Sequence, residues 1–394
     1  MDVRTIRAVV TIAAWLLPTF LCAEQPVVRG FGFAGGCDTD AYVQETAPFT
    51  NLCTIELDDD RLLDARWISR MVVRDVELIV SVQNVFFEAV GQPGDLGQPH
   101  DLRADSQQRW RSAISGREEA LRTLAALIFV ADEPYWNGIS RSELATANHL
   151  VTSTLPFATT VTSFSPQIAG EWFEGRDVPT GAVAYHHYAV LDPLTDGRYQ
   201  SNVNMIKAHA HGRPLYYVLD AWWTPSHGEA GIRPEDMADV ARNYFRMASA
   251  DADAIGLVAF RWSSSAAGIG ARDLPFIARQ THRDIGSEIT GKCAVPNFVE
   301  PRTALFLVGC RYVATMAVRT DDGVRLASAM PREADYGTFV LDEGEVIGGV
   351  RVIEGEPPTV FASLYTNTPA HIRVYETATG AIVWPVDSAS IPNR

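Results

Sequence analysis

Eight apolar, strand-like runs separated by helical stretches constrain the fold of this 394-residue chain more than any other feature. The runs are Val28–Ala34, Leu52–Leu57, Leu78–Val85, Leu127–Ala131, Thr159–Phe164, Ala182–Tyr188, Leu215–Leu219 and Ile255–Trp262. Strands that alternate with helices form βαβ units and a parallel sheet. Eight such units in about 265 residues match a closed (β/α)8 TIM barrel better than an open doubly wound sheet. No Gly-x-Gly-x-x-Gly sequence follows the first run, so a dinucleotide site has no support.

The segments between the runs carry helix signals. Two stretches, 60–76 and 109–124, each place apolar side chains on one face of a helix;. Ser140 and Glu143 have the spacing of a capping box, and Pro234 marks the start of another helix;. We therefore predict the α/β class, with a helix after most strands.

After about residue 290 the pattern changes to short alternating runs separated by turn signals such as Glu343-Gly344. This pattern predicts a small antiparallel β-domain that resembles a sandwich. We therefore expect a leader at residues 1–23, a catalytic barrel at 24–290 and an all-β accessory domain at 291–394. The accessory domain either binds glycan or serves only in packing.

Residues 1–23 have the features of a secretory signal peptide. Arg4 and Arg7 precede an apolar run that is too short to span a bilayer comfortably, and Ala23 stands at a plausible cleavage point;. An uncleaved anchor and a lipoprotein linked through Cys22 are the alternatives. We expect a secreted or periplasmic protein that keeps no stable membrane span after cleavage.

The cysteines that follow the leader fall into two close pairs, Cys37 with Cys53 and Cys293 with Cys310. In an oxidising compartment such pairs predict two local disulfides, although two other pairings are formally possible. No Cys-x-x-Cys or His/Cys metal spacing occurs, so we do not expect a structural zinc site.

The formal net charge of −15 restricts the partners of the protein. Contact with nucleic acid phosphates needs a basic face, which this composition does not predict. The charge is compatible with a neutral or a cationic ligand. We expect a monomer that needs neither a metal nor a cofactor.

In a parallel barrel the active site lies at the carboxyl ends of the strands. The predicted strand ends bring carboxylates, amides, histidines and aromatic rings together at Asp58, Asn84, Asp132, Glu133, Tyr135, Trp136, His186, Tyr188, Asp220, Trp222 and Trp262. Aromatic rings stack on the apolar faces of sugars, and polar groups bind their hydroxyls, so a carbohydrate substrate is favoured. Glycoside cleavage needs two carboxyl groups, about 5–5.5 Å apart for retention or about 6.5–9.5 Å apart for inversion.

Asp132-Glu133-Pro134, at the end of the fourth run, resembles the Asn-Glu-Pro motif of the large retaining clan of TIM-barrel glycoside hydrolases. The resemblance implies that Glu133 is the general acid/base and that His186, Tyr188 and Trp262 contact the substrate. It covers residues 26–285 and lies in the positions of residues at the strand ends more than in long stretches of identical sequence.

Two positions depart from the pattern of that clan. Asp132 replaces the amide residue that contacts the 2-hydroxyl group of the sugar, and Asp220 stands where the clan has its nucleophilic glutamate. Because aspartate is one methylene shorter, Asp220 either attacks after a shift of its strand or acts as the base for a water molecule. Glu229, in the following loop, is the alternative partner.

We therefore predict a secreted glycoside hydrolase in which Glu133 protonates the glycosidic oxygen and Asp220 is the nucleophile or the base. Burial in an apolar strand and the neighbouring Asp132 would raise the pKa of Glu133. The structural alternative is an ion pair between Glu133 and a rim arginine such as Arg261. The alternative from another class is a barrel that binds carbohydrate without cleaving it, or an envelope-associated scaffold. The sugar, the linkage, and the choice between endo and exo action and between retention and inversion stay open.

Overall fold

The computed structural model describes residues 28–293, except 93–97, 168–169 and 174, together with the strands of the carboxyl-terminal region. The described segments of that region are 304–308, 312–320, 323–325, 328–333, 336–340, 346–353, 358–364, 370–376 and 381–387. The predicted leader, residues 1–23, lies outside the described residues.

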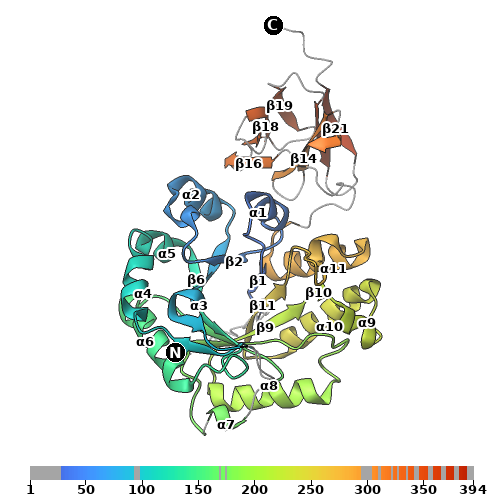
Figure 1. Ribbon diagram of the computed structural model, residues 1–394. Helices are drawn as coiled ribbons and strands as arrows, with labels where there is room; N and C mark the ends of the chain where they lie inside the picture. The colour runs from blue at the N-terminus through green and yellow to red at the C-terminus, as the bar shows by residue number, and fades with distance from the viewer. Residues whose placement is uncertain are drawn as a thin grey trace, which may run out of the picture.

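Eight parallel strands form a closed barrel, which confirms the predicted fold class (Figure 1). The order around the barrel is β1-β11-β9-β8-β7-β6-β3-β2, and every neighbouring pair is parallel. The strands are β1 (Gly30–Phe33), β2 (Leu52–Glu56), β3 (Glu77–Ser81), β6 (Ala125–Asp132), β7 (Thr160–Phe164), β8 (Ala182–Tyr185), β9 (Leu215–Asp220) and β11 (Ala254–Phe260). Each overlaps one of the predicted apolar runs.

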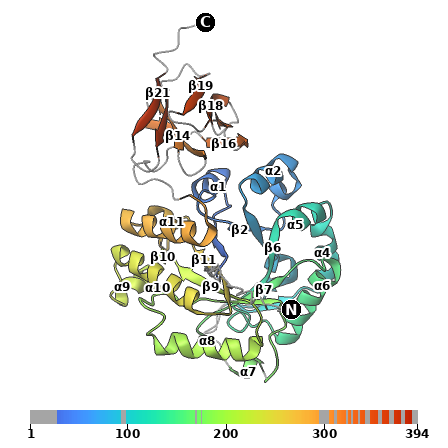
Figure 2. The same cartoon turned by 180° about the vertical axis from the view of Figure 1, so that it is seen from behind.

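Helices surround the barrel on its outer side (Figure 2). They are α1 (Asp40–Thr46), α2 (Ala65–Val73), α3 (Gln83–Phe86), α4 (Ser106–Ile114), α5 (Glu118–Leu124), α6 (Arg141–Thr154), α7 (Gly170–Phe173), α8 (Gly197–Ala210), α9 (Pro225–Glu229), α10 (Met237–Ala250) and α11 (Phe276–Thr290). Short 3-10 helices lie at η1 (Asp60–Leu63), η2 (Pro234–Asp236) and η3 (Ala271–Asp273). Two small antiparallel ribbons pair β4 (Phe87–Ala89) with β5 (His100–Leu102), and β10 (Trp222–Trp223) with β12 (Ile269–Gly270).

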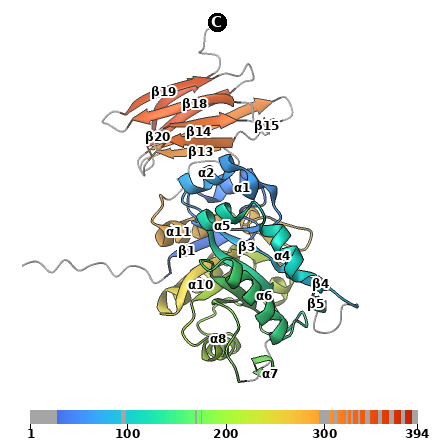
Figure 3. The same cartoon turned by 90° about the vertical axis from the view of Figure 1, so that its left-hand side faces the viewer.

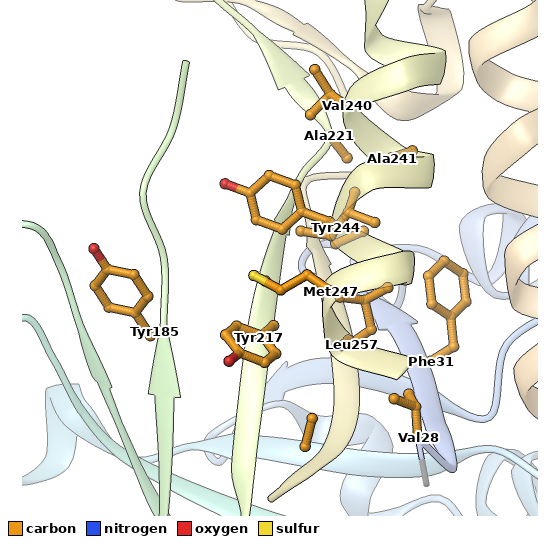
Figure 4. Packing of buried hydrophobic residues seen from close by; sticks show 14 of the residues in the cluster. Val28, Phe31, Tyr185, Tyr217, Ala221, Val240, Ala241, Tyr244, Met247 and Leu257 are labelled. Atoms are coloured by element: carbon orange, nitrogen blue, oxygen red, sulfur yellow. The ribbon is translucent and has the colours of Figure 1, made fainter. Parts of the chain in front are cut away.

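The barrel has an inner and an outer apolar layer because successive strand residues point to opposite faces. The inner layer consists of Leu52, Ile79, Leu127, Val161, Ala182, Ala184 and Tyr216, with partly buried neighbours. In the outer layer, Tyr244 and Met247 of α10 pack against Tyr217 of β9 and Leu257 of β11 (Figure 4). The inside of the barrel is therefore packed core, and a site must form above it, at the strand ends.

Two predicted helices differ from the observed ones. The stretch 109–124 is divided between α4 and α5, and Gly116 lies in the turn between them with φ of +79°, a conformation that glycine adopts without strain;. The stretch 60–76 is divided between η1 and α2, which buries Trp67 but leaves Val72 exposed. The helical apolar stripes were thus predicted correctly only in part.

Two local predictions are confirmed. Ser140 Oγ accepts a hydrogen bond from Glu143 N–H, and Glu143 Oε2 accepts one from Ser140 N–H, so a capping box opens α6. Cys37 and Cys53 form a disulfide, which ties the segment after β1 to β2. The second predicted pair includes Cys310, which lies outside the described residues.

The strands after residue 304 form two antiparallel sheets (Figure 3). They are β13 (Ala304–Val308), β14 (Tyr312–Thr320), β15 (Gly323–Arg325), β16 (Ser328–Glu333), β17 (Tyr336–Val340), β18 (Val346–Ile353), β19 (Thr359–Leu364), β20 (Ala370–Glu376) and β21 (Ile382–Asp387). One sheet has the order β13-β14-β20-β21, with β15 paired to β14, and the other has the order β16-β17-β18-β19. Met316 and Ile372 of the first sheet share one core with Phe339 and Val350 of the second, as in the predicted sandwich;.

Within the described ranges, no helix combines the length and the apolar character needed to cross a membrane.

Candidate active site

A cavity of about 450 Å³ lies at the carboxyl ends of the barrel strands. Its floor is the inner apolar layer, including Leu127, Val161 and Tyr216. The polar and aromatic groups on its wall are Thr54, Glu56, Ser81, Asp132, Glu133, Ser163, His186, Tyr188, Trp222 and Phe260. A largely apolar cavity with a few convergent polar groups is the usual form of a small-molecule site.

An irregularity in β6 turns Asp132 into this cavity. Leu127 and Phe129 point into the barrel, so strict alternation would next place residue 131 there;. The pairing of β6 with β7 shifts register between Phe129 and Ala131, and Ala131 instead packs beside Val130 in the outer core. Asp132 therefore takes the inward place, as expected after a β-bulge;.

Glu133 follows in a left-handed backbone conformation. Its φ of +44° is uncommon for a residue with a side chain and costs about 1–3 kcal/mol;. Glu133 N–H donates to Ser163 O, and Asn137 N–H donates to Glu133 O, both at 2.9 Å. Asp132 N–H donates to Gln83 Oε1 at 2.8 Å. These bonds hold the strained turn and place both adjacent carboxyl groups on the cavity wall.

His186 links Glu133 to the next strands. Its Nε2 lies 2.8 Å from Glu133 Oε1, and its Nδ1 lies 3.0 Å from Ser163 Oγ. The imidazole ring also stacks on Tyr188 with 4.9 Å between ring centroids. His187 points the other way, into the outer layer, as strand alternation predicts;. The partner of Glu133 is thus a histidine, while Arg261, the rim arginine considered above, bonds to Ser263.

The pKa of Glu133 is lowered below its ordinary value of 4.5. Burial raises this pKa, but hydrogen bonds from His186 and Ser165 and the charge of His186 together lower it by more. The prediction of a raised pKa is therefore wrong, because it considered the apolar strand and Asp132 but not the histidine. At neutral pH the free site holds Glu133 as a carboxylate.

Asp132 shows the opposite shift. Burial raises its pKa, the charge of Glu133 raises it further, and the charge of His186 and a hydrogen bond from Ser163 oppose the rise. Two adjacent carboxyl groups on one wall therefore differ in their affinity for a proton, which is the arrangement that acid–base chemistry uses.

We expect His186→Leu to raise the pKa of Glu133. The substitution removes the hydrogen bond and the charge that lower the pKa, while burial, which raises it, persists;. The measurement is a pH titration of the Glu133 side-chain carboxyl followed by ¹³C NMR. His149→Leu, on α6, is the matched control and should leave the titration unchanged. A Glu133 pKa that stays lowered in His186→Leu would contradict the role assigned to the histidine.

Asp220 ends β9 but is sealed off from the cavity. Its side chain is 0% exposed and does not line the cavity wall. Asp220 Oδ2 accepts hydrogen bonds from His227 Nε2 and from Ala189 N–H, each at 2.8 Å. In this structure Asp220 therefore does not reach the cavity that Glu133 lines, contrary to expectation, because His227 of α9 covers it. Glu229, the alternative partner, is exposed at the end of α9 and also lies off the cavity wall.

The predicted aromatic contacts divide into two groups. Tyr188 and Trp222 line the cavity. Tyr135 and Trp136 are half-buried in the turn after β6, and neither lines the cavity. The turn that presents Glu133 thus directs the two following rings elsewhere.

Trp262, a predicted substrate contact, does not line the cavity. The side chain is buried, packs edge-on against Phe33 with ring centroids 4.8 Å apart, and donates from Nε1 to Glu45 Oε2. Phe260, two residues earlier in β11, occupies the inward place and lines the cavity. The aromatic residues near the end of β11 predicted that a ring would lie at the cavity, but they did not predict that this ring is Phe260.

A second cavity of about 410 Å³ adjoins the first. Asp58 and Asn84, both predicted substrate contacts, lie on its wall. Glu56 and Ser81 line both cavities. Glu56 lies near the end of the predicted run Leu52–Leu57, and its alternation with Thr54 in β2 is the sequence signal that points it inward;.

In the part of the chain that the structure describes, no group of three or more His, Cys, Asp or Glu side chains is arranged to hold a metal ion.

No protein-family profile matches the chain, and no curated protein sequence matches it. Solved structures do match in fold. A GH113 β-1,4-mannanase covers 67% of this chain and 99% of its own, with 10% identity and a TM-score of 0.43. Xylanase 10B from Thermotoga maritima covers 68% and 97%, with 13% identity and a TM-score of 0.41. A GH128 oligosaccharide-binding protein from Trichoderma gamsii covers 68% and 98%, with 11% identity and a TM-score of 0.41.

These matches do not show the family to which the chain belongs. At such identities and scores, they show neither substrate nor mechanism. Function must follow from the residues of the chain's own cavity.

Proposed function

We propose that this protein is a secreted glycoside hydrolase that cleaves a polysaccharide or an oligosaccharide at the mouth of its barrel. The observation that supports this most is the placement of Glu133: a strained turn and His186 hold its carboxylate on the cavity wall, beside Asp132. Backbone strain of this kind is often found at functional sites.

The composition of the cavity wall favours a sugar as the ligand. Tyr188, Trp222 and Phe260 offer rings for the apolar faces of pyranoses, and Asp132 and Ser163 offer polar atoms for hydroxyl groups. Burial raises the pKa of Tyr188 well above 10, so its hydroxyl stays protonated and can donate. The second cavity, with Asp58 and Asn84, extends the binding surface beyond one sugar unit.

We assign Glu133 the role of the catalytic base. Its lowered pKa leaves it ionised at neutral pH, which suits removal of a proton from an attacking water molecule better than donation to a leaving group;. This reverses the direction of proton transfer that the sequence resemblance implied for Glu133. Residues 1–23, as a signal peptide, would direct the enzyme out of the cytoplasm;.

The second candidate function is carbohydrate binding without cleavage. It is favoured by the burial of Asp220, because the predicted carboxylate partner of Glu133 does not reach the cavity. Both candidates use the same cavity, and turnover separates them.

The test is an assay of the full protein against a panel of plant, fungal and bacterial polysaccharides and their oligosaccharides. New reducing ends would support hydrolysis, with Glu133→Gln protein, prepared in parallel, as the control for contaminating enzymes. Binding of a panel member by calorimetry, without any new reducing ends, would support the second candidate and reject hydrolysis of the ligands tested.

A further inference from the structure

Glu56 stands where the two cavities meet. It is the last residue of β2, and the alternation Leu52, Thr54, Glu56 directs its side chain to the inner side of the barrel;. It lines both the 450 Å³ cavity and the 410 Å³ cavity. A sugar chain that occupies both cavities must therefore pass Glu56.

Glu56 and Glu133 line one cavity from strands that are two places apart in the barrel. In the barrel order, β3 alone separates β2 from β6, so the two strands lie roughly 9–10 Å apart;. Their inward side chains converge on one cavity. The register pairs Glu56 with Ser81 and Ser81 with Phe129, so Glu133 also lies four residues further along its strand than the level of Glu56. An offset both across and along the strands favours the wider separation that leaves room for a water molecule over the roughly 5–5.5 Å of a covalent mechanism.

We propose that Glu56 is the second catalytic carboxyl group, the proton donor to the glycosidic oxygen of a sugar chain lying across both cavities. This inference rests on the proposed glycosidase function and supplies the partner that Asp220 does not. It also assigns the bond to be cleaved to the junction of the cavities, with sugar units on both sides of it.

The proposed step is a single displacement by water. The oxygen of a water molecule forms a bond to the anomeric carbon as the bond from that carbon to the glycosidic oxygen breaks. Glu56 gives its proton to the departing oxygen, and Glu133 takes a proton from the attacking water. The products are two shorter saccharides, with inversion at the anomeric carbon, and proton exchange with solvent restores both carboxyl groups.

The surroundings of Glu56 support this direction of proton transfer. Burial raises the pKa of Glu56, a hydrogen bond with Ser81 opposes the rise, and the charges of Asp58 and Asp38 raise it further. Asp105, just before α4, and Arg109 of α4 also line the second cavity, and they pair with each other at 3.0 Å, while Arg111 is the other charged residue of α4. Glu56 and Glu133 thus have pKa values shifted in opposite directions, as an acid and a base in one site require;.

The test compares two leaving groups in Glu56→Gln. On an unactivated oligosaccharide from the panel, kcat should fall by about 10²–10⁴-fold, because the departing alkoxide then lacks a proton donor. On the 2,4-dinitrophenyl glycoside of the same sugar, kcat should fall by less than about tenfold, because that leaving group needs no proton. The high-pH limb of kcat/KM should also disappear in the variant. A purely structural role for Glu56 would affect both substrates equally.

Glu77→Gln is the matched control, because Glu77 begins β3 at the opposite end of the barrel and its pKa is also raised by burial. It should keep wild-type activity, and thermal unfolding should show that Glu56→Gln is folded. If Glu56→Gln keeps the wild-type kcat on the oligosaccharide while Glu133→Gln is inactive, the role of Glu56 is overturned and the proposed function stands. Equal losses on both substrates overturn the role of Glu56 too. Failure of the wild-type protein to cleave any glycoside overturns both this inference and the proposed function.

Discussion

Glu133→Gln is expected to lower kcat by about 10²–10⁴-fold on both activated and unactivated glycosides. The reason is that a base acts on the attacking water, whose reactivity does not depend on the leaving group. Glutamine has nearly the same shape as glutamate and offers His186 an amide oxygen, so the cavity should keep its form and KM should change little. The pattern would differ from that of Glu56→Gln, which spares the activated substrate.

The pH profile provides a second measurement on the same residue. A base must be ionised, so kcat/KM should fall as the pH decreases through the pKa of Glu133, which lies below 4.5;. The wild-type protein should therefore stay active to pH values below 4.5, as far as its fold persists. Glu229→Gln is the control, because Glu229 is exposed and lies away from the cavity. Wild-type turnover in Glu133→Gln would remove Glu133 from the mechanism.

The architecture of the barrel was predictable because it depends on a pattern that many residues share. Each buried strand needs a run of apolar residues whatever its neighbours are, so the eight runs indicated the eight strands. The helices were harder to predict from single stretches. One glycine, Gly116, divides the stretch 109–124 into two helices, although apolar residues recur at helical spacing on both sides of it. A local backbone preference thus overrode the hydrophobic pattern there.

The site was less predictable because it depends on where single residues point. Periodicity in β6 would put Asp132 on the outer side, and only the register shift before it brings the carboxyl group inward. Glu133 reaches the same wall through a left-handed turn, which propensity does not predict for glutamate. His186 and Tyr188, by contrast, lie where alternation places them. Alternation thus accounts for the inward side chains at the regular end of β8, whereas at the end of β6 the motif indicated the residues but periodicity did not explain their direction.

Asp220 illustrates a different limit of sequence reasoning. Its strand and its place at the strand end were predicted correctly, yet His227 of α9, seven residues further on, covers it. Whether a strand-end carboxylate reaches the solvent depends on the loop that follows, and loops leave weak periodic signals.

Asp220→Ala is expected to lower the free energy of unfolding by about 2–6 kcal/mol, because it leaves two buried donors without an acceptor, at about 1–3 kcal/mol each. His227 Nδ1 accepts a hydrogen bond from Thr224 N–H at 3.1 Å, so the proton of the neutral ring lies on Nε2 and points at Asp220. Without the carboxylate, this N–H and the N–H of Ala189 are both left buried without an acceptor;. Denaturant titration of the full chain measures the loss.

Asp220→Asn separates this structural role from a catalytic one. The amide keeps one acceptor oxygen and the shape of the side chain, so we expect a smaller loss of stability and, below the melting transition, kcat within a few-fold of the wild type. Asp239→Ala, which removes a surface ion pair with Arg242, is the control and should cost no more than about 1 kcal/mol;. If Asp220→Asn instead melts like the wild type and loses kcat by about 10²-fold or more, Asp220 belongs to the catalytic machinery. α9 would then have to move to bring its carboxylate to the substrate, and the assignment of Glu56 as the partner of Glu133 would lose its main support.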